Sequence, residues 1–402
     1  MRKYLLLTTT LLLGACGGGS GAGPDVVSAP PPVVGGKEGS FVDPTEAKTY
    51  KAIGGTHTFQ YRVEDRSDNN GQTGQLYQGN ASTVRDSDIS ISYDPRDAIY
   101  TLKVVDALSG ASFDGRFQDP AHRVDFGGAN EPQFGNARFQ NPNVQFLESG
   151  TGDASKGGAE TPPVGQTDES LDITTMFMLK PGSETQYVTY AGFVSNQISW
   201  SEDSATNAAG EEVNFDVVDF TLQRGAFAYG ELTNTAAVPK TGSASYQGSM
   251  IASMIFNPTL DGQSQVGSDI YPSYFQWVEG SANLAVNFAA GTIGLDLSGR
   301  AFATQDDGVS GFTGEGVLAQ GATFSATGAG TINLANFGGF RGEFSQAGFV
   351  NPDGSRYDVN IAGSSLDGAF YGPAAEEVGG GFRIVGGTPD ERIDILGAFI
   401  GK

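Results

Sequence analysis

Hydrophobic and polar positions alternate with a period of two from residue 56 onward. The clearest runs are residues 57–63, 89–93, 100–104, 187–193 and 213–222. Gly, Asn, Asp and Pro separate these runs, and no apolar stretch of useful length follows the 3.6-residue period of a helix. Because side chains alternate between the two faces of a strand, the pattern predicts β-strands throughout. The predicted fold class is all-β.

The region after Val238 is predicted to consist of short antiparallel strands rich in Gly, Ala, Ser and Thr. In Asn351–Gly354, Pro352 fixes φ and Gly354 accepts a positive φ, so this segment is predicted to be a hairpin turn. About eight to ten strands suit a closed barrel, since closure removes exposed edges and glycine permits the bends. The expected strands are residues 243–255, 275–288, 292–297, 311–318, 322–334, 340–350, 356–361, 368–371, 380–385 and 392–400.

The alternation is lost between Asp106 and Glu169, where the chain is rich in Gly, Asn, Gln and Pro. Six phenylalanines occur there at irregular spacing: Phe113, Phe117, Phe126, Phe134, Phe139 and Phe146. They either anchor long loops onto a sheet or form an aromatic surface that binds a ligand. Under the second interpretation we predict that Phe126, Phe134, Phe139 and Phe146 contact the ligand, together with His122, which suits haem or a metal.

The N-terminus has the pattern of a secretory signal. Met1–Lys3 is basic, and residues 4–13 form an apolar stretch too short to span a bilayer as a helix. The sequence Leu13-Gly14-Ala15-Cys16 that follows resembles a bacterial lipoprotein signal. This resemblance implies cleavage before Cys16 and lipidation of its thiol and amine. The alternative is an ordinary signal peptide beside an incidental cysteine.

Residues 16–40 are predicted to be a flexible Gly/Ser/Pro tether without apolar periodicity. Gly17, where an Asp would direct retention, implies export of such a lipoprotein to the outer membrane. Several acyl chains anchor a protein more stably than one. The predicted partner of Cys16 is therefore the lipid bilayer.

Composition narrows the possible partners. The 402 residues contain 23 Lys+Arg and 46 Asp+Glu, a formal net charge of −23. Nucleic acid is a poor partner for such a chain because its phosphates would be repelled. The single cysteine, once lipidated, leaves no thiol for a disulfide, a nucleophile or a metal site.

Few residues can support catalysis. Of the two histidines, His57 lies in a strand-period run and is predicted to be a half-buried structural residue. The neighbours Glu376 and Glu377 are predicted to lie in a solvated turn where they point apart, with the glycines after them turning the chain. No hydrolase, zinc-protease or nucleotide-binding motif occurs. We predict no enzyme activity and no cofactor.

Several segments carry a family resemblance: Gly368–Phe382, Ile395–Lys402, Ala226–Gly230, Pro239–Gly248, and Leu179–Gly182 with Tyr187–Tyr190. They resemble the transferrin-binding protein B family. The resemblance implies surface lipoproteins that bind host transferrin, haemoglobin, free haem or, occasionally, complement regulators. In that family each lobe pairs a handle domain with a barrel. This chain has room for one lobe rather than two, which puts transferrin itself in doubt.

These observations combine into one prediction. A handle-like antiparallel β-domain (41–237) precedes a closed eight-stranded antiparallel β-barrel (238–402). The protein is expected to bind an iron or haem carrier at the outer membrane and to present it to an integral membrane transporter. A structural or adhesive surface lipoprotein is the alternative, while a porin-like barrel and an enzyme using paired carboxylates are less consistent with the sequence.

Overall fold

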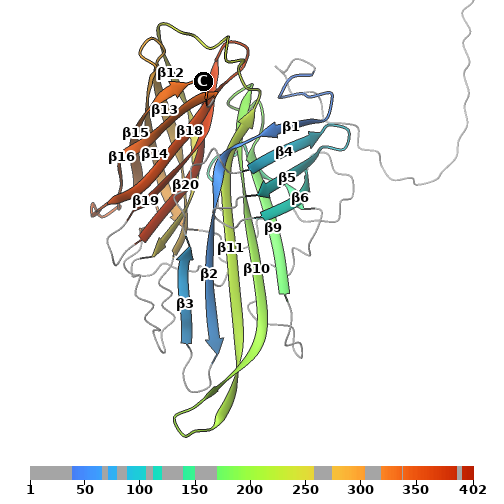
Figure 1. Ribbon diagram of the computed structural model, residues 1–402, viewed down its shortest axis with the longest axis vertical. Helices are drawn as coiled ribbons and strands as arrows, with labels where there is room; N and C mark the ends of the chain where they lie inside the picture. The colour runs from blue at the N-terminus through green and yellow to red at the C-terminus, as the bar shows by residue number, and fades with distance from the viewer. Residues whose placement is uncertain are drawn as a thin grey trace, which may run out of the picture. The chain divides into compact units, whose positions relative to one another are not determined.

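Strands make up the regular structure of the described chain (Figure 1). The computed structural model describes residues 39–65, 71–78, 88–105, 112–119, 139–149, 170–257, 274–303, 318–336, 338–386 and 392–402. Cys16, His122, Phe126 and Phe134 lie outside these ranges, as do the signal segment and nearly all of the tether. The predicted all-β class is confirmed. Among the described residues no helix is long and apolar enough to cross a membrane.

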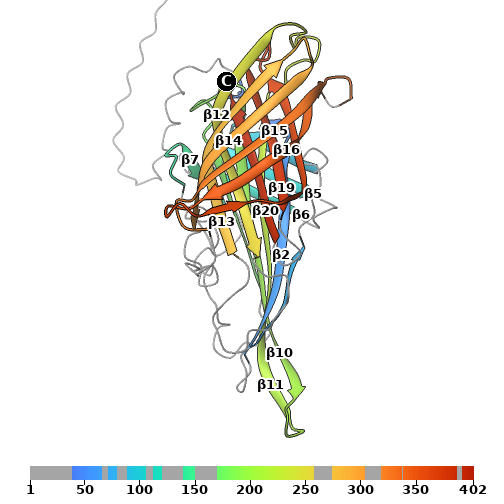
Figure 2. The same cartoon turned by 90° about the vertical axis from the view of Figure 1, so that its left-hand side faces the viewer.

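Two antiparallel sheets form the region before the barrel. The outer sheet has the order β1-β4-β5-β6-β8, with bounds Lys48–Lys51, Asp88–Asp94, Ile99–Val105, Ser112–Gln118 and Glu148–Ser149. The central sheet has the order β3-β2-β11-β10-β9-β7, with bounds Gly71–Gln78, Ile53–Asp65, Glu212–Gly230, Val188–Thr206, Ser170–Leu179 and Val144–Phe146. The long hairpin β10–β11 continues beyond the ends of β9 and β2 (Figure 2).

The barrel is closed and has eight strands, as predicted. In the order β15-β14-β13-β12-β20-β19-β18-β16, the last strand pairs with the first, and the short β17 pairs with β16. The bounds of β12 to β16 are Ser243–Asn257, Tyr274–Asn287, Thr292–Ala303, Thr323–Asn333 and Gly339–Val350. Those of β17 to β20 are Arg356–Asp358, Ile361–Tyr371, Glu377–Gly386 and Arg392–Gly401. The predicted hairpin turn lies between β16 and β17, with Gly354 at φ 86°.

Apolar side chains fill the barrel interior. On β15, Phe324 and Ala326 are buried, whereas Thr323, Ser325 and Thr327 are exposed. This alternation places one set of side chains inside the ring and the other outside it. The interior is therefore a packed core.

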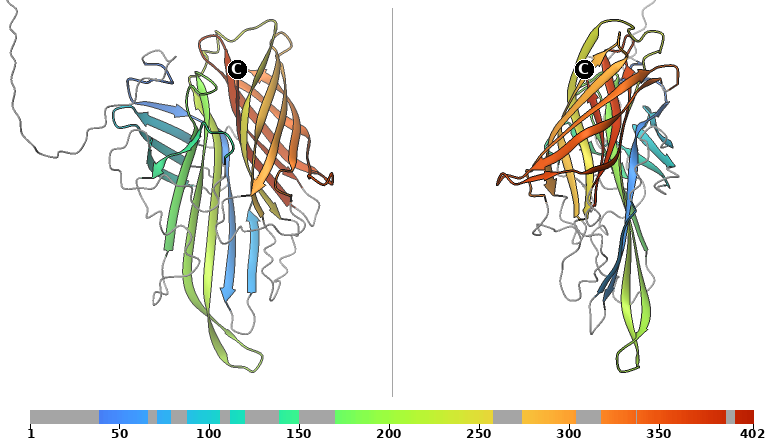
Figure 3. Two further views of the ribbon diagram at one scale, coloured as in Figure 1. Left: turned by 180° about the vertical axis from the view of Figure 1, so that it is seen from behind. Right: turned by 60° about the vertical axis from the view of Figure 1, so that its left-hand side comes forward.

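The part of the central sheet formed by residues 53–58, 174–179, 188–195 and 224–230 is buried on both of its faces (Figure 3). One face packs against the outer sheet, through a core that includes Ile91, Leu102, Phe193 and Phe227. The other face packs against the outside of the barrel, through a core that includes Ile53, Tyr190, Trp277, Leu396 and Ile400. Three stacked layers result, with the central sheet in the middle.

Glycines let the central sheet and the barrel approach closely. We predicted that Gly379–Gly381 turn the chain, and this is wrong because they lie inside β19 and pair with both β18 and β20. A Cβ atom on Gly381 would lie 2.7 Å from the Cα atom of Gly54, and one on Gly379 would lie 2.7 Å from a methyl group of Val188. Only glycine permits backbones to meet in this way.

Candidate functional site

Two of the predicted ligand-binding residues, Phe139 and Phe146, lie in the described chain. Both are partly buried and belong to what we call the junction loop, residues 139–146, whose last three residues form the short strand β7. The ring of Phe139 lies with its centroid 4.6 Å from that of Phe177 and 6.2 Å from that of Trp277. Phe146 lies 5.3 Å from Phe139. The loop thereby joins β9 of the central sheet to β13 of the barrel.

Carboxylates fix the backbone of the junction loop. The Glu279 carboxylate, on β13, accepts hydrogen bonds from the backbone N–H of Gln140 at 2.7 Å and of Asn141 at 2.9 Å. Glu184 accepts from the Asn141 side chain at 2.8 Å and from the Ser249 hydroxyl, on β12, at 2.6 Å. For Phe139 and Phe146 this packing favours the loop-anchoring interpretation. A ligand contact by these residues stays a prediction.

Glu377 is a buried clamp between the barrel and the segment leading into β10. Its two carboxylate oxygens accept hydrogen bonds from the backbone N–H of Gln186 at 2.6 Å and of Tyr187 at 2.7 Å. We predicted a solvated turn, which is wrong for Glu377 because its side chain is turned inward and only 3% of the residue is exposed. Burial raises the pKa of Glu377, and the two hydrogen bonds oppose this rise. Glu376 is exposed, as predicted, and accepts from the Ala374 N–H.

A second buried group, here called the interface cluster, consists of His57, Arg224, Ser253, Arg383 and Asp394. His57 is fully buried on β2, whereas we predicted a half-buried residue. Its Nε2 atom lies 3.0 Å from the Ser253 hydroxyl, and its Nδ1 atom lies 3.4 Å from the Asp394 carboxylate. Arg383 donates two hydrogen bonds to Asp394, at 3.0 and 2.6 Å. Arg224 stands opposite His57 in the pairing of β11 with β2.

The environment shifts the pKa values of two of these groups. Burial lowers the pKa of His57; the adjacent Asp394 opposes this shift, while the charges of Arg383 and Arg224 reinforce it. Burial alone would raise the pKa of Asp394, but Arg383 and His57 hold it well below its usual range. At neutral pH the cluster therefore contains a neutral imidazole beside an ion pair.

Ser253, His57 and Asp394 lie next to one another in the order of a serine-hydrolase triad. Each of the three residues is at most 1% exposed, and Arg383 engages the carboxylate. A substrate cannot reach the hydroxyl while the barrel and the central sheet are packed together. The three residues connect the central sheet to the barrel, because His57 lies on β2 and its two partners lie on β12 and β20.

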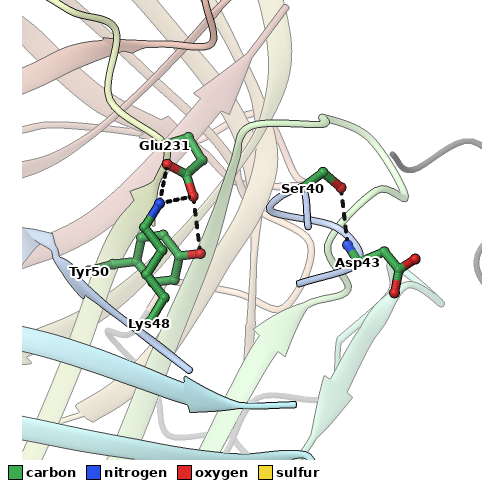
Figure 4. A network of polar contacts seen from close by, with 5 residues as sticks. All are labelled: Ser40, Asp43, Lys48, Tyr50 and Glu231. Carbon is green, nitrogen blue, oxygen red and sulfur yellow. Dashed lines mark hydrogen bonds and ion pairs between the residues drawn. The ribbon is translucent and has the colours of Figure 1, made fainter. Parts of the chain in front are cut away.

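A third polar network fixes the first strand of the outer sheet (Figure 4). The Lys48 ammonium group lies 2.5 Å from the Glu231 carboxylate, which follows β11. The Tyr50 hydroxyl donates to the same carboxylate at 3.2 Å. Near this network, the Asp43 N–H donates to the Ser40 hydroxyl at 3.2 Å, so the chain entering β1 is also ordered by polar contacts.

In the part of the chain that the structure describes, no three His, Cys, Asp or Glu side chains are grouped so as to hold a metal ion. Sequence reasoning missed Glu279, Glu377, Arg383 and Asp394 as interface residues. For the last two, a signal was present: each charged residue stands between two apolar neighbours inside its strand.

Comparison with known proteins identifies the barrel. Residues 238–402 match the family described as C-lobe and N-lobe beta barrels of Tf-binding protein B. No curated protein matches the chain.

Solved structures of the same kind of protein also match. One is a tryptophan-to-alanine mutant of the vaccine antigen Transferrin Binding Protein B from Haemophilus parasuis Hp5, which is 13% identical with a TM-score of 0.28 over 90% of this chain and 79% of that one. Another is intact Ap-TbpB with its N and C lobes, 12% identical with a TM-score of 0.27 over 90% of this chain and 80% of that one.

The family match agrees with the resemblance that the closing strands of the sequence carry. Residues 238–402 form a closed β-barrel that is similar to the barrels of Tf-binding protein B.

Proposed function

We propose that the mature protein is a lipoprotein of the outer membrane, displayed at the cell surface, that binds an iron or haem carrier protein and presents it to an integral membrane transporter. The match of residues 238–402 to the barrels of Tf-binding protein B carries this proposal. The lipoprotein-like sequence ending at Cys16 supports the anchor, and the tether after it would hold the folded part clear of the bilayer.

Binding would use surface loops and no covalent step. Phe126 and Phe134 are the proposed direct contacts with the carrier, together with His122. Phe139 packs on Phe177 and Trp277, and Phe146 packs on Phe139 and Phe177, so the role of the two rings would be to position the chain that precedes and follows them. The contact surface would thus be set by the barrel as well as by the handle.

The test is affinity capture by the full mature lipoprotein, with haemin, haemoglobin and iron-loaded transferrin as separate baits. Saturable binding of one of the proteins is expected, on purified material and on intact cells. A Cys16→Ser variant is the matched control, because it should lose capture by cells and keep it in solution. Binding to none of the baits would overturn the proposal and favour an adhesive lipoprotein.

Paired substitutions separate the two roles of the phenylalanines. Phe126→Ser with Phe134→Ser should weaken carrier binding at least tenfold without lowering the thermal midpoint. Phe139→Ser with Phe146→Ser should lower the midpoint as well, because these rings are packed in the junction. Unchanged affinity in the first pair would remove those residues from the binding surface.

A porin-like barrel is not favoured by the side-chain pattern. Barrels embedded in lipid carry apolar side chains outside and polar ones inside. Here β13 to β15 show the reverse, with Leu284, Leu295 and Phe324 inside and residues such as Asn283, Asp296 and Ser325 outside.

A further inference from the structure

We propose that His57 makes the contact between the central sheet and the barrel sensitive to acid: protonation of its buried imidazole weakens the packing of these two layers. His57 lies at the layer contact itself, because its strand β2 belongs to the central sheet while Ser253 and Asp394 belong to β12 and β20 of the barrel. A change in its charge therefore acts directly on the contact between the layers.

The groups that face His57 come from four other strands. Arg224 lies on β11, Ser253 on β12, Arg383 on β19 and Asp394 on β20. The positive charges of Arg383 and Arg224 oppose a further positive charge on His57. Asp394 already receives two hydrogen bonds from Arg383, so it cannot fully compensate a second buried cation.

Proton binding gives the direction of the effect. An imidazole exposed by separation of the layers has an ordinary pKa of about 6.5. Packing lowers the pKa of His57, so the separated state binds more protons at mildly acid pH. The packing is most stable above about pH 6.5 and becomes weaker as the pH falls toward the lowered pKa of the packed state. Over this range the equilibrium constant for separation of the layers rises by up to about tenfold per pH unit.

Asp394 acts in a different range. Its pKa is held below the usual value of about 3.9, so its contribution is complete above that value and is lost only at lower pH. Between pH 7.5 and pH 5.5 the carboxylate remains charged. His57 is then the member of the cluster whose charge changes in this window.

The test compares the full mature chain with a His57→Gln variant by hydrogen exchange at pH 7.5 and pH 5.5. Variant and parent are compared at the same pH, so the intrinsic pH dependence of exchange cancels. The opening constant of β2, β19 and β20 should rise about tenfold more in the parent than in the variant on acidification. Peptides from β14 and β15, on the far arc of the ring, should show no such difference. An equal pH response in both proteins overturns the proposal.

A second measurement keeps His57 in place, so it does not depend on whether the His57→Gln variant folds. The chain has only two histidines, so a His122→Gln protein contains His57 alone, and its imidazole NMR signals can be titrated without ambiguity. A midpoint below 6.5 is expected, and a midpoint at or above 6.5 overturns the proposal. Neither readout uses a carrier protein, so the outcome is independent of the proposed function.

Discussion

The barrel interior and the contact between the barrel and the central sheet are both buried, yet they are built differently. The interior core consists of apolar side chains such as Leu284, Leu295 and Phe382. The contact adds to its apolar core the interface cluster and Glu377. Apolar packing loses stability in proportion to the atoms removed, whereas a buried charge without its partner is penalised strongly. The contact is therefore the region more sensitive to the loss of one polar group.

The largest effect is expected from Arg383→Met, which keeps the length of the side chain and leaves Asp394 buried without its ion-pair partner. Removal of one partner of a buried ion pair costs about 3–5 kcal/mol in unfolding free energy. Urea unfolding at pH 7.5 measures this loss. A double variant with Asp394→Leu should recover a large part of it, and no recovery would mean that the arginine acts through packing alone.

Leu295→Ala tests the interior. Its side chain is fully buried inside the barrel, and truncation of such a leucine costs about 3 kcal/mol. Since no titratable group is changed, the difference from the parent should be equal at pH 7.5 and pH 5.5 in the same urea assay. A loss that grew at acid pH would contradict the distinction between the two regions.

Glu377→Gln should have the smallest effect of the three. Its amide cannot accept from both the Gln186 and the Tyr187 N–H groups, so one of these hydrogen bonds is lost at a cost of about 1–2 kcal/mol. Burial raises the pKa of Glu377 and so already disfavours its charged form. The neutral amide of glutamine therefore lowers the stability only modestly. Glu376→Gln is the matched control and should change stability by less than about 0.5 kcal/mol. Equal stability changes in the two variants would show that the hydrogen bonds of Glu377 do not stabilise the fold.

The sequence predicted the strands well because a period of two is a local signal. The barrel was also predictable, since its strands are short and separated by turn residues such as those of Asn351–Gly354. The stacking of layers was not, because burial of the central sheet on both faces depends on residues far apart in the chain. This is why His57 was predicted to be half-buried although the structure buries it fully.

The buried charges were missed for a related reason. A glutamate in a turn and an arginine in a strand both have solvent exposure as their usual state. Their burial becomes visible only when their hydrogen-bond partners are known. For Glu377 these partners are backbone N–H groups in the segment before β10. Of the five residues predicted to bind the ligand, the structure describes Phe139 and Phe146. Phe126, Phe134 and His122 lie outside the described residues.

The pairing of β12 with β20 has a consequence for how the protein reaches its folded state. The strand that opens the barrel pairs with β13 on one side, but its other edge is satisfied only by the last strand of the ring. Until β20 is available, β12 and β19 each present an open edge on which another chain could pair. Contacts between distant strands also form slowly. The β12–β20 contact can therefore form only after the residues of β20 have been synthesised.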